Sequence, residues 1–212
     1  MKLRIMVKKY SGFAAALCLL ALSLAGCGEP KMPDGIEVST VSVSKKGQIS
    51  IWFVEEFTEE YYSLSELTQI ALSEVEEFNS SAGSDRAVTM KKMELLPENR
   101  NKAVAHYQFA DWKSCTAFCT AFNGETFFYG TVEEALKEGF GAEIVLKSVA
   151  DGSLLAGDQF ARETDSHLII TDVKANIYCP AKVAYLNGSA VLNADGSVDT
   201  SQTDGLVYIL LK

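Results

Sequence analysis

The sequence predicts an α+β domain built from antiparallel sheets, with about three helices in its first two thirds and mostly strands in its last third. Two observations lead to this fold class. Runs that alternate apolar and polar residues come in pairs joined by short turns, which is typical of hairpins. Segments with helical spacing begin at capping residues and end at glycines. The chain shows no internal repeat and no second linker, so residues 36–212 are expected to form a single domain.

Two β-hairpins are expected in the first half of the domain. The first joins residues 36–44 to residues 48–56 through Lys45-Lys46-Gly47, a short turn that contains glycine. The second joins residues 87–96 to residues 102–109 through a polar loop. The first pair is β-branched and alternating, which favours strands.

The clearest helix is predicted over residues 63–78. Ser63 and Glu66 have the spacing of a capping box at its start. Apolar residues then recur three and four positions apart, and a stripe of this kind usually faces a core. We therefore expect these side chains to be buried: Leu64, Leu67, Ala71, Val75 and Phe78.

Two shorter helices are predicted further along the chain. Asp111 has the position of an N-cap for residues 112–122, and Asn123-Gly124 would end that helix. Thr131 and Glu134 repeat the capping-box spacing for a helix that ends at Gly139.

The remaining third of the chain has a sequence pattern typical of strands separated by turns. Five segments alternate or are β-branched, and polar or glycine-containing turns separate them. These are residues 142–149, 167–173, 176–186, 189–199 and 205–212.

The N-terminus has the pattern of a secretory signal, which we assign to residues 1–26. Four bases and no acid precede an apolar run of 16 residues, Tyr10 to Ala25. That run is shorter than the ~20 residues that a helix needs to cross a bilayer. A plain signal would end in a small-x-small cleavage site, whereas here the end is Leu24-Ala25-Gly26-Cys27.

These four residues resemble the lipobox of bacterial lipoproteins. The resemblance implies that the Cys27 sulfur receives a diacylglyceryl group and that cleavage makes Cys27 the first residue of the mature chain. It also implies an extracytoplasmic protein held to the cell membrane by its lipid, with the bilayer as a partner. Residues 27–35 would be a tether that reaches less than about 29 Å. The alternative is a plain secreted protein with a chance cysteine.

The charge balance argues against nucleic acid as a partner. Four of the 19 Lys and Arg residues lie in the predicted signal, so the mature chain would carry 15 of them against 28 Asp and Glu residues, a formal charge of −13. A chain this acidic is also not expected to bind anionic lipid electrostatically in addition to its lipid anchor.

A looser likeness covers about two thirds of the mature chain. It is carried by Glu55-Glu56-Phe57, Tyr61-Tyr62, Leu64, Glu66-Leu67, Glu74-Val75, Asn79, Gly130-Thr131, Ala135 and Gly139. These residues resemble a pattern in small uncharacterised lipoproteins of anaerobic Gram-positive bacteria. The resemblance implies a location and a single domain, and it supplies no activity and no catalytic residues.

One segment has an unusual charge composition. Residues 47–85 contain nine acids and no Lys or Arg, so their charge is not balanced locally. The same segment holds aromatic residues near the start of the predicted helix, and acids around aromatics are a reasonable protein-binding surface. The candidate binding residues are Glu55, Glu56, Glu59, Glu60, Tyr61 and Tyr62. The alternative is an ordinary solvated face.

Three cysteines remain after the predicted anchor: Cys115, Cys119 and Cys179. An odd number is not a disulfide framework, and which of them pair, if any, stays open. Cys115 and Cys119 share a helical stripe with Trp112 and Phe122, which favours a buried face over a zinc site. We expect no metal site. A nucleophilic cysteine would need a base beside it, and the sequence does not show one.

Two further features have ordinary interpretations. Residues Asn193–Asp199, "NADGSVD", partly match a calcium loop, but Val191 stands where its first aspartate is needed, so we interpret them as a hairpin turn. His106 falls on the face of its strand opposite Tyr107, where a solvated histidine is expected.

The sequence thus favours a membrane-anchored binding module, non-catalytic and without a cofactor, whose partner is a surface protein or a cell-wall component. Two alternatives stay open. One is an extracytoplasmic enzyme, such as a wall hydrolase, whose site has no linear motif. The other is a small solute-binding lipoprotein, although solute binders usually have two lobes.

Overall fold

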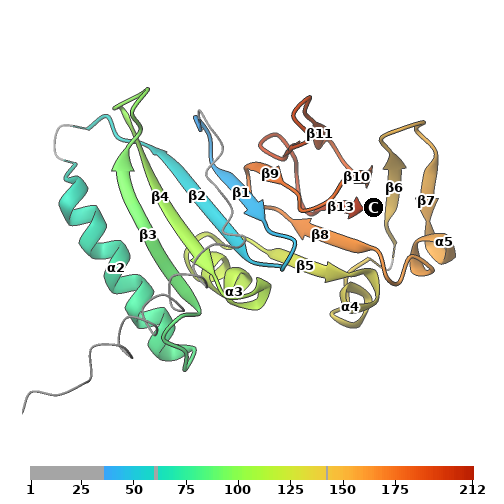
Figure 1. Cartoon of the computed structure of the whole chain (residues 1–212), viewed down its shortest axis with the longest axis horizontal. Helices are drawn as coiled ribbons and strands as arrows, with labels where there is room; N and C mark the ends of the chain where they lie inside the picture. Colours follow the sequence, from blue (N-terminus) through green and yellow to red (C-terminus); the bar gives the residue numbers. More distant parts are fainter. Residues whose placement is uncertain (1–35, 60–61, 142) are drawn as a thin grey trace, which may run out of the picture.

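The computed structural model describes residues 36–59, 62–141 and 143–212, and these residues form an α+β domain of two sheets and four helices (Figure 1). The predicted fold class is therefore confirmed, with one helix more than expected. The predicted signal, the predicted lipidation site Cys27 and the tether to residue 35 lie outside the described residues.

The larger sheet has seven strands, and both predicted hairpins lie in it. In spatial order its strands are β11 (Val191–Leu192), β12 (Val198–Asp199), β9 (Asn176–Tyr178), β1 (Thr40–Val43), β2 (Ile49–Glu56), β4 (Lys102–Phe109) and β3 (Val88–Leu95). All neighbours are antiparallel except β1 and β9, which are parallel. The parallel pair brings a C-terminal strand beside the first hairpin and so joins the two ends of the domain.

The smaller sheet has six strands and is antiparallel throughout. In spatial order they are β5 (Phe127–Thr131), β8 (His167–Thr171), β13 (Val207–Leu211), β10 (Val183–Leu186), β6 (Val145–Ser148) and β7 (Leu154–Ala156). The sequence pattern does not predict β5 or β7. Both are short, and β5 runs directly into the next helix, so neither shows an alternating pattern of useful length.

Helices α2 (Leu64–Ser81) and α3 (Trp112–Asn123) begin at the predicted capping residues. The Ser63 hydroxyl accepts a hydrogen bond from the Glu66 backbone N–H at 3.3 Å, and the Asp111 carboxylate accepts one from the Ser114 N–H at 2.8 Å. Helix α3 ends at Gly124, whose φ of 71° lies in the left-handed region that glycine adopts without strain.

The two later helices are short. At α4 (Val132–Lys137) the Thr131 hydroxyl accepts from the Glu134 N–H at 3.2 Å, and the Glu134 carboxylate accepts from the Thr131 N–H at 2.8 Å. This reciprocal pair is the capping box that the sequence predicts. Helix α5 (Gly157–Ala161) was not predicted, because it has no side-chain cap and is too short to show helical periodicity.

The main core lies between the two sheets and under α3. The larger sheet and the smaller sheet contribute fully buried side chains to it, among them Val41, Ile51, Phe109, Ile169, Val207 and Ile209. A second core lies on the opposite face of the smaller sheet, where α4 and α5 cover it. Helix α2, by contrast, runs alongside the edge strand β3 (Figure 1). It therefore covers only part of the face that β2 and β4 present.

Candidate functional site

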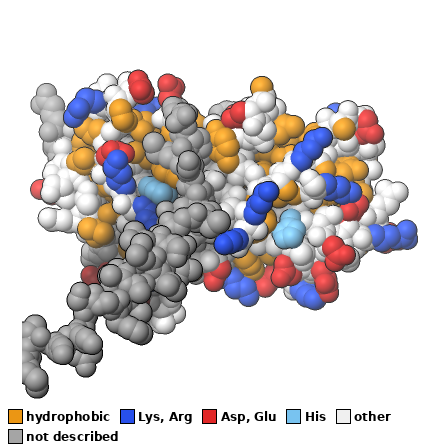
Figure 2. Space-filling view, in the orientation of Figure 1, with side chains coloured by type: hydrophobic (Ala, Val, Ile, Leu, Met, Phe, Trp, Pro, Cys, Tyr) orange, Lys and Arg blue, Asp and Glu red, His pale blue; other side chains and the backbone are white. Residues whose placement is uncertain are grey.

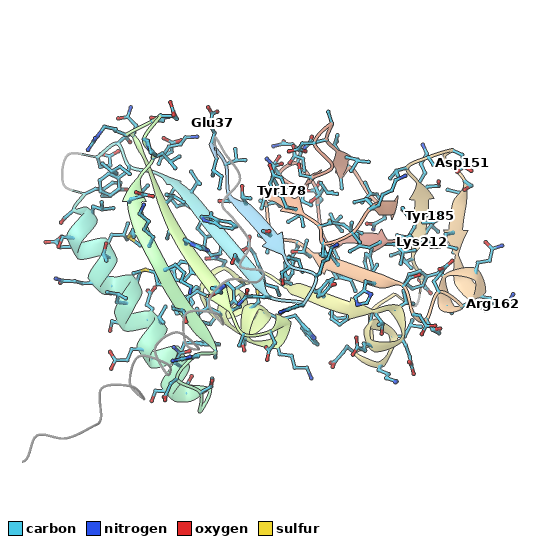
Figure 3. The ribbon with its side chains drawn as sticks, in the orientation of Figure 1. Glu37, Asp151, Arg162, Tyr178, Tyr185 and Lys212 are labelled. Carbon is cyan, nitrogen blue, oxygen red and sulfur yellow. The ribbon has the colours of Figure 1, made fainter. Side chains whose placement is uncertain are left out.

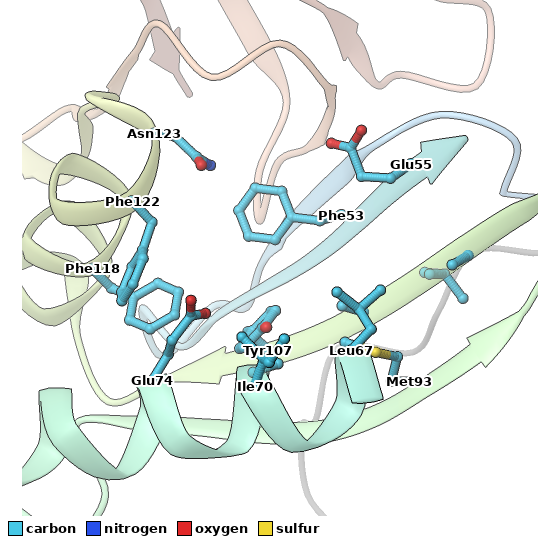
Figure 4. Close-up of a pocket in the computed structure, with 14 residues that line it drawn as sticks. Phe53, Glu55, Leu67, Ile70, Glu74, Met93, Tyr107, Phe118, Phe122 and Asn123 are labelled. Atoms are coloured by element: carbon cyan, nitrogen blue, oxygen red, sulfur yellow. The ribbon is translucent and has the colours of Figure 1, made fainter. Parts of the chain in front are cut away.

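A groove runs between α2 and the face of the larger sheet formed by β2, β3 and β4 (Figure 4). It consists of two adjoining cavities of about 320 Å³ and 500 Å³. Because both cavities are lined by Glu55, Leu67, Ile70 and Ala103, they form one continuous depression. We call the first, which reaches α3, the inner cavity, and the second, at the start of α2, the outer cavity.

The inner cavity takes its walls from two helices and three strands. In the pairing of β2 with β4, Phe53 lies opposite Ala105 and Ile51 opposite Tyr107, which puts Phe53, Ala105 and Tyr107 on one face of the sheet. That face is the floor. The side walls are Leu67, Ile70, Ala71 and Glu74 from α2, Met93 from β3, and Phe118, Phe122 and Asn123 from α3.

The outer cavity lies where β2 leads into α2. Besides the shared residues it is lined by Glu56, Phe57, Tyr62, Ser63 and Glu66. The rings of Phe57 and Tyr62 approach each other, with centroids 5.4 Å apart. Tyr62 is 44% exposed, so this aromatic pair is available at the mouth of the groove.

The structure corrects the expectation that the whole apolar stripe of α2 is buried. Ala71 and Val75 are buried, but Leu67 is 39% exposed and lines the groove together with Ile70, which is 55% exposed. The reason is the position of α2 at the sheet edge. Val75 and the half-buried Phe78 in its later turns pack against the core, whereas its first two turns overhang the groove.

A similar correction applies to α3. The helical spacing predicts that Phe122 lies on a buried stripe, whereas Phe122 is 45% exposed and Phe118 is buried instead. Phe118 packs within 5.4 Å of the Tyr107 ring and within 4.6 Å of the Phe122 ring, measured between centroids. It therefore holds Tyr107 and Phe122, two of the aromatic residues that line the inner cavity, in place.

The lining of the groove is acidic as well as apolar. Among the described residues that line it are four carboxylates, Glu55, Glu56, Glu66 and Glu74, and no Lys or Arg. Lys102, from β4, lies 3.7 Å from the Glu56 carboxylate. At the floor, burial and the negative charge of Glu74 raise the pKa of Tyr107 to about 12, so its phenol is neutral at ordinary pH.

The predicted binding residues are only partly brought together here. Glu55, Glu56 and Tyr62 line the groove. Glu59 is exposed, and its carbonyl accepts a hydrogen bond from the Tyr62 N–H at 3.0 Å, but it is not a lining residue. Glu60 and Tyr61 lie outside the described residues. The sequence does not indicate that Ile70, Tyr107 and Phe122 line a groove, because nothing in it says which apolar positions the fold leaves uncovered.

The cysteines occupy the core. Cys115 and Cys119 are buried and Cys179 is half-buried, and all three are free thiols. Burial raises the pKa of the Cys115 thiol, and it raises the pKa of Cys179 to about 12. Within the described ranges, no group of three or more His, Cys, Asp and Glu residues is placed to hold a metal ion.

The two remaining sequence features are structural. The segment at Asn193 is a hairpin turn between β11 and β12, in which the Asp195 carboxylate accepts from the Ser197 N–H at 3.0 Å and from the Tyr178 hydroxyl at 3.0 Å. His106 lies on the face opposite Tyr107 as predicted, but it is half-buried. Its ring stacks on Trp52 at 4.4 Å between centroids, so the expected solvated histidine is wrong.

Another cavity, of about 480 Å³, lies beside the smaller sheet, where Lys45, His167 and Lys212 are among its lining. Figure 2 shows basic and acidic side chains together on the half of this face formed by the smaller sheet, and Figure 3 shows Lys212 beside Tyr185. This cavity is mixed in charge. Lys212 is paired with Glu163 at 3.0 Å, and Asp165 also lines the cavity. Its lining therefore carries charges of both signs, whereas the described charged residues that line the groove are all acidic.

No protein-family model, curated protein or solved structure matches this chain. In the part of the chain that the structure describes, no helix has the length and hydropathy needed to cross a membrane. The main indication of function is therefore the geometry of the groove.

Proposed function

We propose that the protein is a membrane-anchored, extracytoplasmic binding module, and that its groove holds an amphipathic, basic segment of a partner polypeptide. The lipid on Cys27 would supply the anchor, and the short tether would hold the domain near the membrane surface. The partner is thus another protein at the cell surface.

The observation that carries this proposal is the exposure of large apolar side chains along one groove. Leu67, Ile70 and Phe122 are each more than a third exposed, and they line the same depression. Contiguous exposed apolar surface bordered by polar residues is typical of interaction sites. Apolar grooves beside helices commonly take up peptide segments whose anchors repeat at helical or strand spacing.

Charge complementarity supports a basic occupant. The four lining carboxylates lie on both cavities, from Glu56 and Glu66 in the outer one to Glu74 in the inner one. Bases flanking the apolar anchors of a partner would meet these acids, which speeds association and disfavours acidic competitors.

The test uses the full chain in phosphatidylcholine nanodiscs and a defined fluorescent probe. The probe is a 14-residue peptide of leucine and lysine in an amphipathic order, and its counterpart carries glutamate in place of lysine. We expect the anisotropy of the lysine peptide to rise with protein concentration, and that of the glutamate peptide to stay flat. Protein-free nanodiscs measure binding to lipid alone.

A matched pair of variants locates the binding. Ile70→Asp places a charge in the groove, whereas Leu72→Asp places the same charge on α2 at a position that is 48% exposed and lines neither cavity. We expect Ile70→Asp to weaken binding at least tenfold and Leu72→Asp to leave it unchanged. Equal affinities of wild type and Ile70→Asp would remove the groove as the binding site.

A further inference from the structure

We propose that the inner cavity contains a cation subsite, in which the Glu74 carboxylate and the rings of Phe53 and Phe122 receive an aliphatic ammonium group. The inference rests on the proposed function in one respect, because the ammonium group belongs to a lysine side chain of the docked segment. It specifies where in the groove the segment is recognised, namely the inner cavity, and which chemical group is bound there.

The geometry of the rings is the first support. Phe53 from β2 and Phe122 from α3 border the same space, and the side chain of Glu74 projects into it from α2 (Figure 4). Phe122 is 45% exposed and Phe53 is half-buried, so both rings offer a surface to a ligand. Cations bind over aromatic rings within about 6 Å of the centroid.

The rings are held in place from behind. Tyr107 meets Phe53 edge-on with centroids 5.9 Å apart, and the buried Phe118 contacts Tyr107 and Phe122. Side chains fixed by packing lose little freedom when a ligand binds, and this preorganisation favours affinity. The subsite is therefore a rigid aromatic corner with one acid.

The charge of Glu74 gives the subsite its preference. Glu74 is half-buried, whereas Glu55, the other carboxylate that lines the inner cavity, is exposed, and no described Lys or Arg lines that cavity. The phenol of Tyr107, on the floor of the inner cavity, is neutral. A neutral ligand group would leave the half-buried carboxylate without a counter-charge, whereas an ammonium group on an apolar stem matches both the acid and the rings.

The first experiment compares two peptides that differ only by the ammonium group of one side chain. Starting from the amphipathic probe, a single central lysine is replaced by norleucine, which keeps the apolar stem and removes the charge. We expect the lysine peptide to bind wild type about tenfold more tightly. Glu74→Gln should abolish this preference, and Glu76→Gln, an exposed position of α2 outside both cavities, should keep it.

The second experiment tests the subsite without any peptide. n-Butylammonium is titrated into the full chain, and the NMR signals of the Tyr107 and Phe122 rings are followed, with n-butanol as the uncharged control. We expect saturable shifts with the ammonium probe that Glu74→Gln weakens about tenfold and that Phe122→Leu weakens as well.

The outcomes separate the two proposals. Equal affinity for the lysine and norleucine peptides, or identical shifts with butylammonium and butanol, would overturn the cation subsite and leave the groove intact. If neither peptide binds while butylammonium still shifts the two rings in a Glu74-dependent way, the peptide-binding function fails and the cation subsite stands.

Discussion

Glu74 and Tyr107 line the same cavity, where a carboxylate on the wall formed by α2 lies toward a phenol on the floor from β4, the strand next to the edge strand β3 (Figure 4). Burial and the charge of Glu74 raise the pKa of Tyr107 to about 12. The phenol that borders the groove also packs against the core residue Phe118, so the groove and the stability of the domain depend on the same side chain.

The first prediction concerns alkaline stability. A tyrosine whose pKa is about 10 when unfolded and about 12 when folded holds its proton more tightly in the folded state. Its contribution is complete below pH 10 and is lost as the pH rises from about 10 to about 12. We expect wild type to lose stability in this window more steeply than Tyr107→Phe, by at most about 3 kcal/mol. Urea unfolding at pH 9, 10 and 11 measures the difference, and parallel curves for the two proteins would contradict it.

The second prediction concerns the capping box of α4. Thr131→Ala removes the hydroxyl that accepts from the Glu134 N–H, so it should lower the free energy of unfolding by about 1 kcal/mol. Thr164→Ala, at an exposed threonine, is the control and should change it by less than about 0.5 kcal/mol. Thermal and urea denaturation measure both. Equal losses in the two variants would mean that the cap contributes nothing.

Local signals made much of the fold predictable. Asp111 and Gly124 bound α3 because a cap and a left-handed terminus depend on a few neighbouring residues. The parallel pairing of β1 with β9 could not be predicted, because it joins strands from opposite ends of the domain. Nothing near either strand encodes that pairing.

The groove was predictable only in part, for the same reason. The periodicity of α2 correctly showed an apolar face, but whether Leu67 is covered depends on where α2 sits on the sheet. Glu55 and Glu56, which the surplus of acids indicates in the sequence, line the groove. Tyr107, in the neighbouring strand, carried no such signal, since a tyrosine alternating with apolar residues is typical of any half-buried strand.

The third prediction is that the three cysteines are structural and bind no metal. Burial keeps the thiols of Cys115 and Cys179 protonated, so few thiolates are present to react at pH 8. We expect no labelling of positions 115, 119 and 179 by a thiol reagent until the chain is denatured, with sites identified by mass spectrometry. The melting temperature should be the same with and without a chelator. A drop of several degrees would indicate a structural metal.

The fourth prediction concerns the anchor. Cys27→Ser should leave an uncleaved precursor that incorporates no labelled fatty acid in the cells that make it, because serine has no sulfur to receive the lipid. Cys179→Ser, at a half-buried cysteine of the domain, is the control and should be labelled like wild type. Labelled fatty acid on the Cys27→Ser chain would show that the anchor assignment is wrong.

The fifth prediction separates the roles of charge and aromatic contact at the mouth of the groove. Exposed charges mainly set the rate of association, whereas a side chain that loses its water on binding mainly sets the rate of dissociation. Glu55→Lys with Glu66→Lys should therefore slow association with the basic peptide about tenfold at low salt and flatten its salt dependence. Tyr62→Ala removes an exposed ring that contacts Phe57, so it should speed dissociation instead.

The control for the charge reversal is Glu76→Lys with Glu77→Lys. It changes the net charge of the chain by the same amount, and both positions are exposed on α2 away from the groove. Stopped-flow anisotropy at two salt concentrations gives both rate constants for all three variants. If the two double reversals slow association equally, the association rate depends only on the total charge of the protein, and the acids of the groove do not contribute to it specifically. If only the reversal within the groove slows it, the occupant meets Glu55 and Glu66 on its way into the groove.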